Sequence, residues 1–203
     1  MKVLADDLDL GDALRTTARE GAAHVPHVLD EEFRRRLRGE IGSGPFAPFE
    51  EEFGAVRQQI DGYDIADPMA AFPLTRLLCD HLVKVVRSHG EGIRGLATWE
   101  PNEVGVAHYA SGSIGITPHL DGKWYRRLVA VVTLYGEARF AVCGSRDPAD
   151  VVVEWSVGPG DLVLMRAPGL SGHRDGRPFH LVEGPRGRER LSLGVRMAVG
   201  GPS

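Results

Sequence analysis

Residues 117–122 read Thr-Pro-His-Leu-Asp-Gly, and this stretch constrains the fold more than any other part of the chain. In an extended strand, side chains two residues apart project to the same face. The imidazole of His119 and the carboxylate of Asp121 can therefore reach one metal ion while Leu120 points the other way. A surface turn with a solvated Asp is the competing interpretation, because Pro, Asp and Gly favour turns. The rest of the C-terminal half decides between the two.

That half has the pattern of short strands separated by turns. Residues 128–134 form an apolar run rich in β-branched side chains, which favour strands. Further strands are predicted at 103–109, 140–142, 151–155, 162–165 and 191–197. Turn signals rich in Gly, Pro, Ser and Asp separate them. Short strands at this spacing, after N-terminal helices, predict an antiparallel β-sandwich or jelly roll.

The N-terminal half has helical patterns instead. Asp30 is a good N-cap for a helix that runs to about Ile41, because apolar side chains recur after it at helical spacing. Further helices are predicted at 8–24 and 73–89, and a mixture of strand and loop at 53–66. The chain is therefore predicted to be α+β and mainly β, with a jelly-roll core buttressed by N-terminal helices.

Length and composition fit one domain over residues 1–203. With 42% hydrophobic and 26% charged residues, the chain is typical of a globular protein with a full core. Residues 1–98 would form the helical buttress and lid, and residues 99–198 the jelly-roll core. The two cysteines, Cys79 and Cys143, are predicted to be buried thiols rather than a disulfide.

The charge pattern limits the partners that we expect. A net charge of -4 argues against an electrostatic nucleic-acid binder. No run of eighteen apolar residues is present, and the N-terminus lacks the apolar segment of a signal peptide. We therefore expect a cytoplasmic protein without membrane contact that acts on a small molecule. No motif specifies the oligomeric state.

Three further motifs follow the His-Leu-Asp stretch. Pro159-Gly160-Asp161 opens an apolar strand, His180 lies in a Pro-Phe-His-Leu-Val segment, and Arg190-Leu191-Ser192 begins ten residues later. With these motifs in this order, residues 100–198 resemble the Fe(II)/2-oxoglutarate-dependent oxygenase superfamily, whose core is a double-stranded β-helix. Two histidines and one carboxylate on one face of an octahedral ion are typical of such non-haem iron sites.

The resemblance implies roles for particular residues. His119, Asp121 and His180 would bind Fe(II) and form the catalytic centre. Arg190 would pair with the distal carboxylate of 2-oxoglutarate, since a guanidinium offers two parallel hydrogen bonds to a carboxylate. Ser192, on the same strand face, could add a hydroxyl donor. Tyr109 matches a position where related proteins often bind the cosubstrate, although a buried strand tyrosine is an equal alternative.

The third metal ligand has a second candidate in His173. Its gaps of seventeen residues to Arg190 and twenty-three to Arg196 resemble the AlkB-type nucleic-acid demethylase branch, where both arginines contact the cosubstrate. Residues 171–176 have the composition of an exposed loop, so we prefer His180. Arg196 has the same strand parity as Arg190 and would either line the barrel or lie near its mouth.

Other polar residues have simpler interpretations. Four histidines are expected in the helical part as surface or satisfied core groups, namely His24, His27, His81 and His89. His108 has no partner that the sequence identifies. Residues 123–127 are interpreted as a solvated strand edge rather than a substrate contact.

The implied reaction is oxidation, most simply hydroxylation, of a small organic molecule by O2. 2-Oxoglutarate would chelate the iron through its keto acid and be converted to succinate and CO2. The intact Asp121 favours a non-halogenating reaction, because Ala or Gly there would leave room for a halide on the iron. Two alternatives stay open, an AlkB-like demethylase of nucleic acid and a non-catalytic, cupin-like metal-binding protein.

Overall fold

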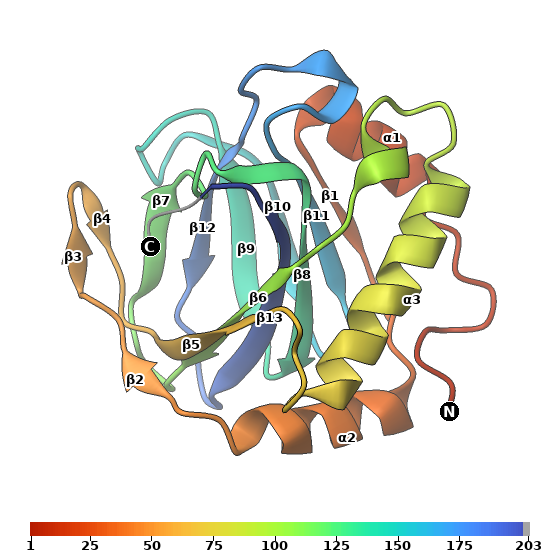
Figure 1. The fold of residues 1–203 in the computed structure, drawn as a ribbon. Helices are drawn as coiled ribbons and strands as arrows, with labels where there is room; N and C mark the ends of the chain where they lie inside the picture. Colours follow the sequence, from red (N-terminus) through yellow and green to blue (C-terminus); the bar gives the residue numbers. More distant parts are fainter. Residues whose placement is uncertain (201–203) are drawn as a thin grey trace.

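The computed structural model describes residues 1–200, and two antiparallel sheets lie face to face at its centre (Figure 1). The larger sheet has the strand order β1-β11-β8-β13-β6-β5-β2. Its strands are β1 (Ala22–Val25), β2 (Ala47–Pro48), β5 (Asp61–Ala66), β6 (Glu103–Tyr109), β8 (Tyr125–Tyr135), β11 (Leu162–Arg166) and β13 (Arg190–Ala198).

The smaller sheet has the order β10-β9-β12-β7. Its strands are β7 (Gly115–His119), β9 (Ala138–Cys143), β10 (Val151–Val157) and β12 (Phe179–Glu183). The short strands β3 (Glu52–Phe53) and β4 (Val56–Arg57) form a separate hairpin. Buried side chains from both sheets, among them Val129, Phe140 and Val182, fill the space between them. This arrangement is the jelly roll that the strand pattern predicts, and it confirms the fold class.

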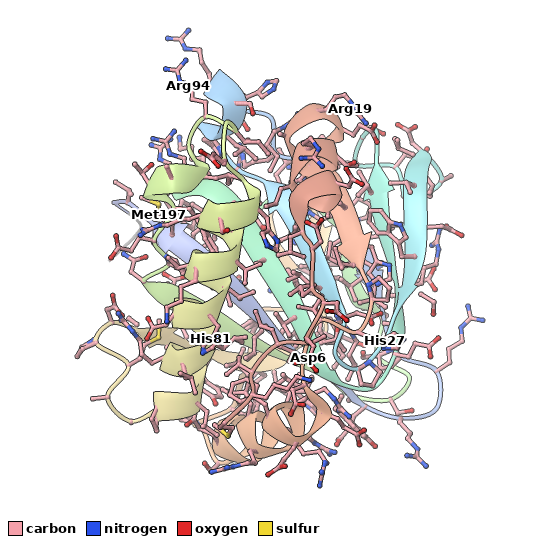
Figure 2. All side chains as sticks on the ribbon, turned by 90° about the vertical axis from the view of Figure 1, so that its right-hand side faces the viewer. Asp6, Arg19, His27, His81, Arg94 and Met197 are labelled. Carbon is pink, nitrogen blue, oxygen red and sulfur yellow. The ribbon has the colours of Figure 1, made fainter. Side chains whose placement is uncertain are left out.

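Three helices cover the outer face of the larger sheet (Figures 1 and 2). They are α1 (Gly11–Glu20), α2 (Glu31–Gly42) and α3 (Pro73–His89), with the short 3-10 turns η1 (Leu96–Thr98) and η2 (Leu170–Gly172). Phe33, Leu37 and Leu82 are fully buried in the core that the helices share with the sheet. Burial of each such side chain contributes about 1.5–3 kcal/mol, so this core holds the sheet in place.

The predicted helix ends are right where a cap defines them. The Asp30 carboxylate accepts a hydrogen bond from the Phe33 amide at 3.0 Å and begins α2 one residue later, as predicted. The prediction of a helix over 8–24 was wrong at both ends. Gly21 adopts a left-handed conformation that ends α1, and β1 then pairs with β11 at the edge of the larger sheet. Only that tertiary pairing reveals the strand.

Two further expectations concern the cysteines and membrane-spanning helices. Cys79 and Cys143 are both buried and free, which confirms the prediction of thiols. Within residues 1–200, no helix has the length and apolar character needed to cross a membrane.

Candidate metal centre

The backbone ladder of the smaller sheet brings two of the predicted ligands together. His119 ends β7 and lies directly opposite His180 on β12, so the register of the two strands sets their separation. Their ring centroids are 4.2 Å apart. The neighbouring strand β9 pairs with the other edge of β12 and contributes Phe140, whose ring stacks on that of His180 at 5.5 Å. His180 is therefore held from both sides.

Asp121 reaches the same point from outside the sheet. The expectation that His119 and Asp121 share one strand was wrong, because β7 ends at His119 and Asp121 lies in the irregular connection to β8. One ligand atom from each of the three residues nevertheless lies within 4.8 Å of the others. The Asp121 carboxylate is 4.0 Å from the Nε2 atom of His180. The three side chains can share one ion.

Hydrogen bonds from the two imidazoles to backbone carbonyls determine which ring nitrogen stays free to bind a metal ion. The Nδ1 atom of His119 lies 3.0 Å from the Thr117 carbonyl oxygen, and that of His180 lies 3.2 Å from the Pro178 carbonyl oxygen. A carbonyl only accepts, so each Nδ1 carries a proton and donates it. Each Nε2 atom then keeps its lone pair. This arrangement is the usual second contact of a metal-binding histidine.

The electrostatics favour the charge states that bind a metal. Burial, and then the proximity of His180, lowers the pKa of His119 to about 4, so this imidazole is neutral at pH 7. Burial alone would raise the pKa of Asp121, but the two histidines and then Arg196 and Arg177 lower it below its usual value. A neutral imidazole and an ionised carboxylate are the forms that coordinate a divalent cation.

Arg190, at the start of β13, lines the same cavity as His119, Asp121 and His180, and it has no acidic partner there. Its side chain is only 1% exposed, and within residues 1–200 it forms no ion pair. Its guanidinium donates to the hydroxyls of Ser192 at 3.1 Å and Thr133 at 2.9 Å, and it lies 5.2 Å from the ring centre of Tyr109. The Nε atom has no partner. A buried cation without a counter-charge is costly, so this group fits an anionic ligand.

The histidine cluster and Arg190 face one cavity of about 160 Å³. Tyr109 and Ser192 line it, as the resemblance implies, and so does Arg196. Thr133 was missed by the sequence analysis. The sequence feature that could have identified it is a hydroxyl residue within the otherwise apolar or aromatic stretch 128–135. In the structure Thr133 is fully buried.

His173 and Arg196, the two alternative site residues, have surroundings that differ from those of His180 and Arg190. His173 is exposed in the loop after η2, and it is not part of the cluster that could hold a metal. Arg196 donates to the Glu103 carboxylate at 3.1 Å and to the Tyr125 hydroxyl at 2.9 Å. Its charge is compensated within the protein, whereas that of Arg190 is not.

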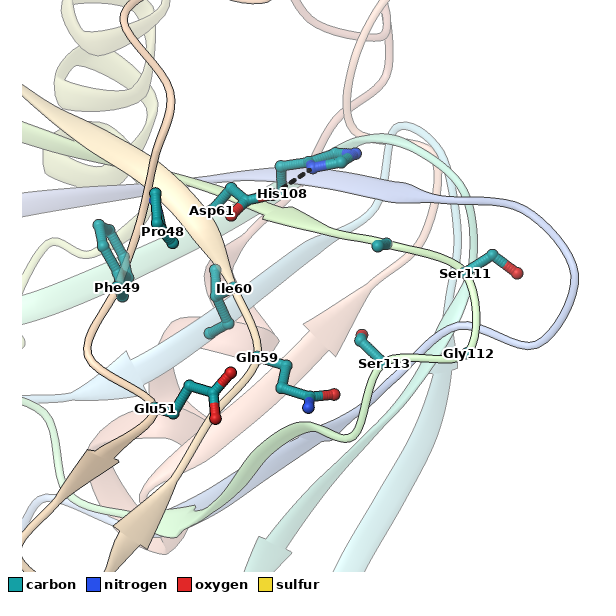
Figure 3. Close-up of a pocket in the computed structure, with 11 residues that line it drawn as sticks. Pro48, Phe49, Glu51, Gln59, Ile60, Asp61, His108, Ser111, Gly112 and Ser113 are labelled. Atoms are coloured by element: carbon teal, nitrogen blue, oxygen red, sulfur yellow. Dashed lines mark ion pairs between the residues drawn. The ribbon is translucent and has the colours of Figure 1, made fainter.

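The remaining histidines lie elsewhere. The expectation that His24 belongs to the helical part was wrong, since it lies in β1 and pairs with the buried Asp161 at 2.9 Å. Figure 2 shows His27 and His81 at the surface on the side of the helices. His108, for which no partner was expected, lies between Asp61 at 3.7 Å and Glu189 at 3.2 Å. With Asp61 it borders a separate cavity of about 400 Å³ (Figure 3).

Known structures share this fold. A Pseudomonas putida prolyl-4-hydroxylase matches with 22% identity and a TM-score of 0.61, over 95% of this chain and all of that one. An oxidoreductase of the 2OG-Fe(II) oxygenase family from Burkholderia pseudomallei matches with 15% identity and a TM-score of 0.63, over 96% and 92% of the two chains. The structure of OsALKBH1 matches with 14% identity and a TM-score of 0.58, over 87% and 98%. No family model and no curated protein matches the chain.

The predicted fold is thus confirmed: the chain has the double-stranded β-helix of the Fe(II)/2-oxoglutarate-dependent oxygenases. Its His-Asp-His cluster and the buried guanidinium of Arg190, which has no acidic partner, fit Fe(II) and a dicarboxylate cosubstrate. The matches include prolyl hydroxylase and ALKBH1 structures alike, so the fold does not specify the substrate.

Proposed function

We propose that this protein is an Fe(II)- and 2-oxoglutarate-dependent dioxygenase that hydroxylates a small organic molecule, with succinate and CO2 as co-products. One observation carries the proposal. A fully buried arginine without an acidic partner lies in the same cavity as two histidines and an aspartate whose ligand atoms converge. A metal site alone explains the cluster, but only an anionic ligand explains why Arg190 stays buried and uncompensated.

In this proposal His119, Asp121 and His180 hold Fe(II), and Arg190 holds the distal carboxylate of 2-oxoglutarate. Fe(II), when bound together with 2-oxoglutarate and O2, supplies the oxidising chemistry. The chain orients the cosubstrate through Arg190, since the hydroxyls of Thr133 and Ser192 fix its guanidinium. Apolar side chains such as Val129 and Met165 line the rest of the cavity and exclude water.

Two observations bear on the alternatives. In the AlkB-type arrangement both arginines contact the cosubstrate, whereas Arg196 here is paired with Glu103. The net charge of -4 gives no electrostatic attraction to nucleic acid. Both favour a small-molecule substrate over a nucleic acid. The uncompensated Arg190 favours an enzyme that binds a cosubstrate over a cupin-like protein that binds only metal.

The test is release of succinate from 2-oxoglutarate, with Fe(II) and O2 each supplied or omitted. We expect slow release without substrate, dependent on both, and faster release with a suitable small molecule. Parallel arms with proline-containing peptides and methylated oligonucleotides separate the substrate classes, and stimulation by oligonucleotides alone would favour the demethylase. If the metal-loaded protein neither binds 2-oxoglutarate nor releases succinate, the dioxygenase proposal is wrong.

A further inference from the structure

The three metal ligands are not held equally well. Backbone pairing between β7 and β12 fixes His119 and His180, but Asp121 lies two residues beyond the end of β7. Irregular connections are more mobile than the strands that they join. Because Asp121 lies outside the β7–β12 pairing, another contact is needed to keep its carboxylate oriented towards a metal bound by the two histidines.

Arg177 makes that contact. Its Nη1 atom donates a hydrogen bond to the backbone carbonyl oxygen of Asp121, across 56 residues of sequence. The side chain of Arg177 is only 14% exposed. Its position in the loop before β12 puts it three residues ahead of the ligand His180. The contact therefore links the β7–β8 connection, which carries Asp121, to the segment before β12, the strand that carries His180.

Asp175 holds Arg177 in place. The two oxygens of its carboxylate accept from Nε at 2.8 Å and from Nη2 at 2.6 Å of the guanidinium. Such a paired arrangement restricts the plane of the guanidinium, which a lysine cannot reproduce. With both these atoms engaged, the remaining Nη1 is directed at Asp121.

The segment 175–178 is itself anchored. The carbonyl oxygen of Gly176 accepts from the Nε atom of Arg166 at 2.7 Å, and Arg166 also donates to the Ala18 carbonyl in α1 at 3.0 Å. The next residue but one, Pro178, supplies the carbonyl that accepts from His180. One fixed segment thus sets the orientation of two ligands from two different elements.

Resting on the function proposed above, we propose that Arg177, held by Asp175, is a positioning residue that pre-orients Asp121 for the metal. It does not touch the ion. Its loss would leave the fold intact and free the connection between β7 and β8. Replacement of groups that orient metal ligands typically weakens metal binding by about 10- to 100-fold.

The test measures Co(II) affinity by titration, with the ligand-field absorption spectrum of bound Co(II) as a readout of coordination geometry. The variants are Arg177→Met, Arg177→Lys, Asp175→Ala and the double variant Arg177→Met/Asp175→Ala. Arg174→Met is the matched control, because it removes the same charge from an exposed position in the same loop. Urea unfolding of the metal-free proteins shows that each variant is folded.

We expect Arg177→Met to weaken Co(II) binding about tenfold or more and to change the spectrum. Arg177→Lys should recover part of the affinity, because an ammonium can still donate to the carbonyl. Asp175→Ala should weaken binding less than Arg177→Met, and the double variant should be no worse than Arg177→Met, since Asp175 acts through Arg177. Arg174→Met should match the wild type.

Equal affinity and spectrum in the wild type and Arg177→Met would overturn the inference. So would an equal loss in Arg174→Met, which would indicate a charge effect, or fully additive losses in the double variant. These outcomes leave the metal centre itself intact. A wild-type protein that binds no metal at all would instead overturn both the inference and the dioxygenase proposal.

Discussion

Arg190 on β13 and Thr133 on β8 are 57 residues apart in sequence, and the guanidinium of one donates to the hydroxyl of the other at 2.9 Å. The contact forms because β13 pairs with β8 in the larger sheet. It fixes a buried cation with neutral hydroxyls rather than with a carboxylate. The charge of Arg190 is thereby left for a ligand, and this property leads to the first prediction.

Replacement of Arg190 by Met should have opposite effects on stability and on cosubstrate binding. Because the side chain is a desolvated cation without a counter-charge, its removal should raise the free energy of unfolding of the cosubstrate-free protein by about 1 kcal/mol or more. Binding of 2-oxoglutarate to the metal-loaded variant should be lost. Chemical denaturation and calorimetric titration measure the two effects.

Arg196→Met is the matched control for this prediction. Here the variant leaves Glu103 without its arginine, so we expect the free energy of unfolding to fall, by about 1–3 kcal/mol. A decrease of similar size in both variants would mean that Arg190 is satisfied within the protein, contrary to our interpretation.

The identity of the third ligand can be tested directly. We expect His180→Gln to weaken Co(II) binding by more than the roughly 100-fold upper range seen for groups that only orient ligands. His173→Gln should bind Co(II) like the wild type, because that side chain is exposed and outside the cluster. Equilibrium dialysis provides the measurement. The reverse result would exchange the two assignments.

Acid should destabilise the metal-free protein through His119. Burial, and then His180, lowers the pKa of this residue to about 4 in the folded state, against 6.5 for the unfolded chain. Between these values the unfolded chain binds the extra proton, so stability is fully present above pH 6.5 and falls as the pH drops towards 4. The full loss through this group, reached below pH 4, is on the order of 3 kcal/mol.

Urea unfolding at a series of pH values checks this prediction. His119→Asn removes the titrating group, and its stability should therefore depend less on pH over the same window. A variant whose pH dependence matches that of the wild type would show that another group is responsible.

The Pro-Gly-Asp motif should matter for stability rather than for chemistry. Asp161 is buried and accepts hydrogen bonds from the amides of Gly158 and His27, and it pairs with His24. We expect Asp161→Ala to lower the free energy of unfolding by about 3 kcal/mol, because it leaves buried donors without acceptors.

Asp147→Ala is the corresponding control, since Asp147 is exposed and caps a turn. It should change stability by about 0.5 kcal/mol or less. Co(II) affinity of the folded Asp161→Ala protein should equal that of the wild type. A selective loss of metal binding without a change in stability would contradict the structural role that we assign.

Local patterns in the sequence determined many of the secondary-structure elements of this protein and marked its candidate metal ligands. Asp30 caps α2 as predicted, because a cap is a contact between residues three apart. The alternation and turn signals after residue 103 predicted six strands of the jelly roll, namely β6, β8, β9, β10, β11 and β13, but not β12, which carries His180. The separation of His119 and Asp121 by one residue, and the segment around His180, predicted three candidate ligands whose donor atoms lie within 4.8 Å of one another in the structure.

What the tertiary structure decided depends on contacts between distant residues, for which no local pattern exists. Residues 22–25 form strand β1 instead of continuing helix α1 because they pair with β11, more than 130 residues away in the sequence. Thr133 meets Arg190 only through strand pairing, and Arg177 meets Asp121 only because two loops lie together at one end of the smaller sheet. Side-chain type and spacing encode periodicity and caps, whereas the position and orientation of ligands depend on how the sheets fold over one another.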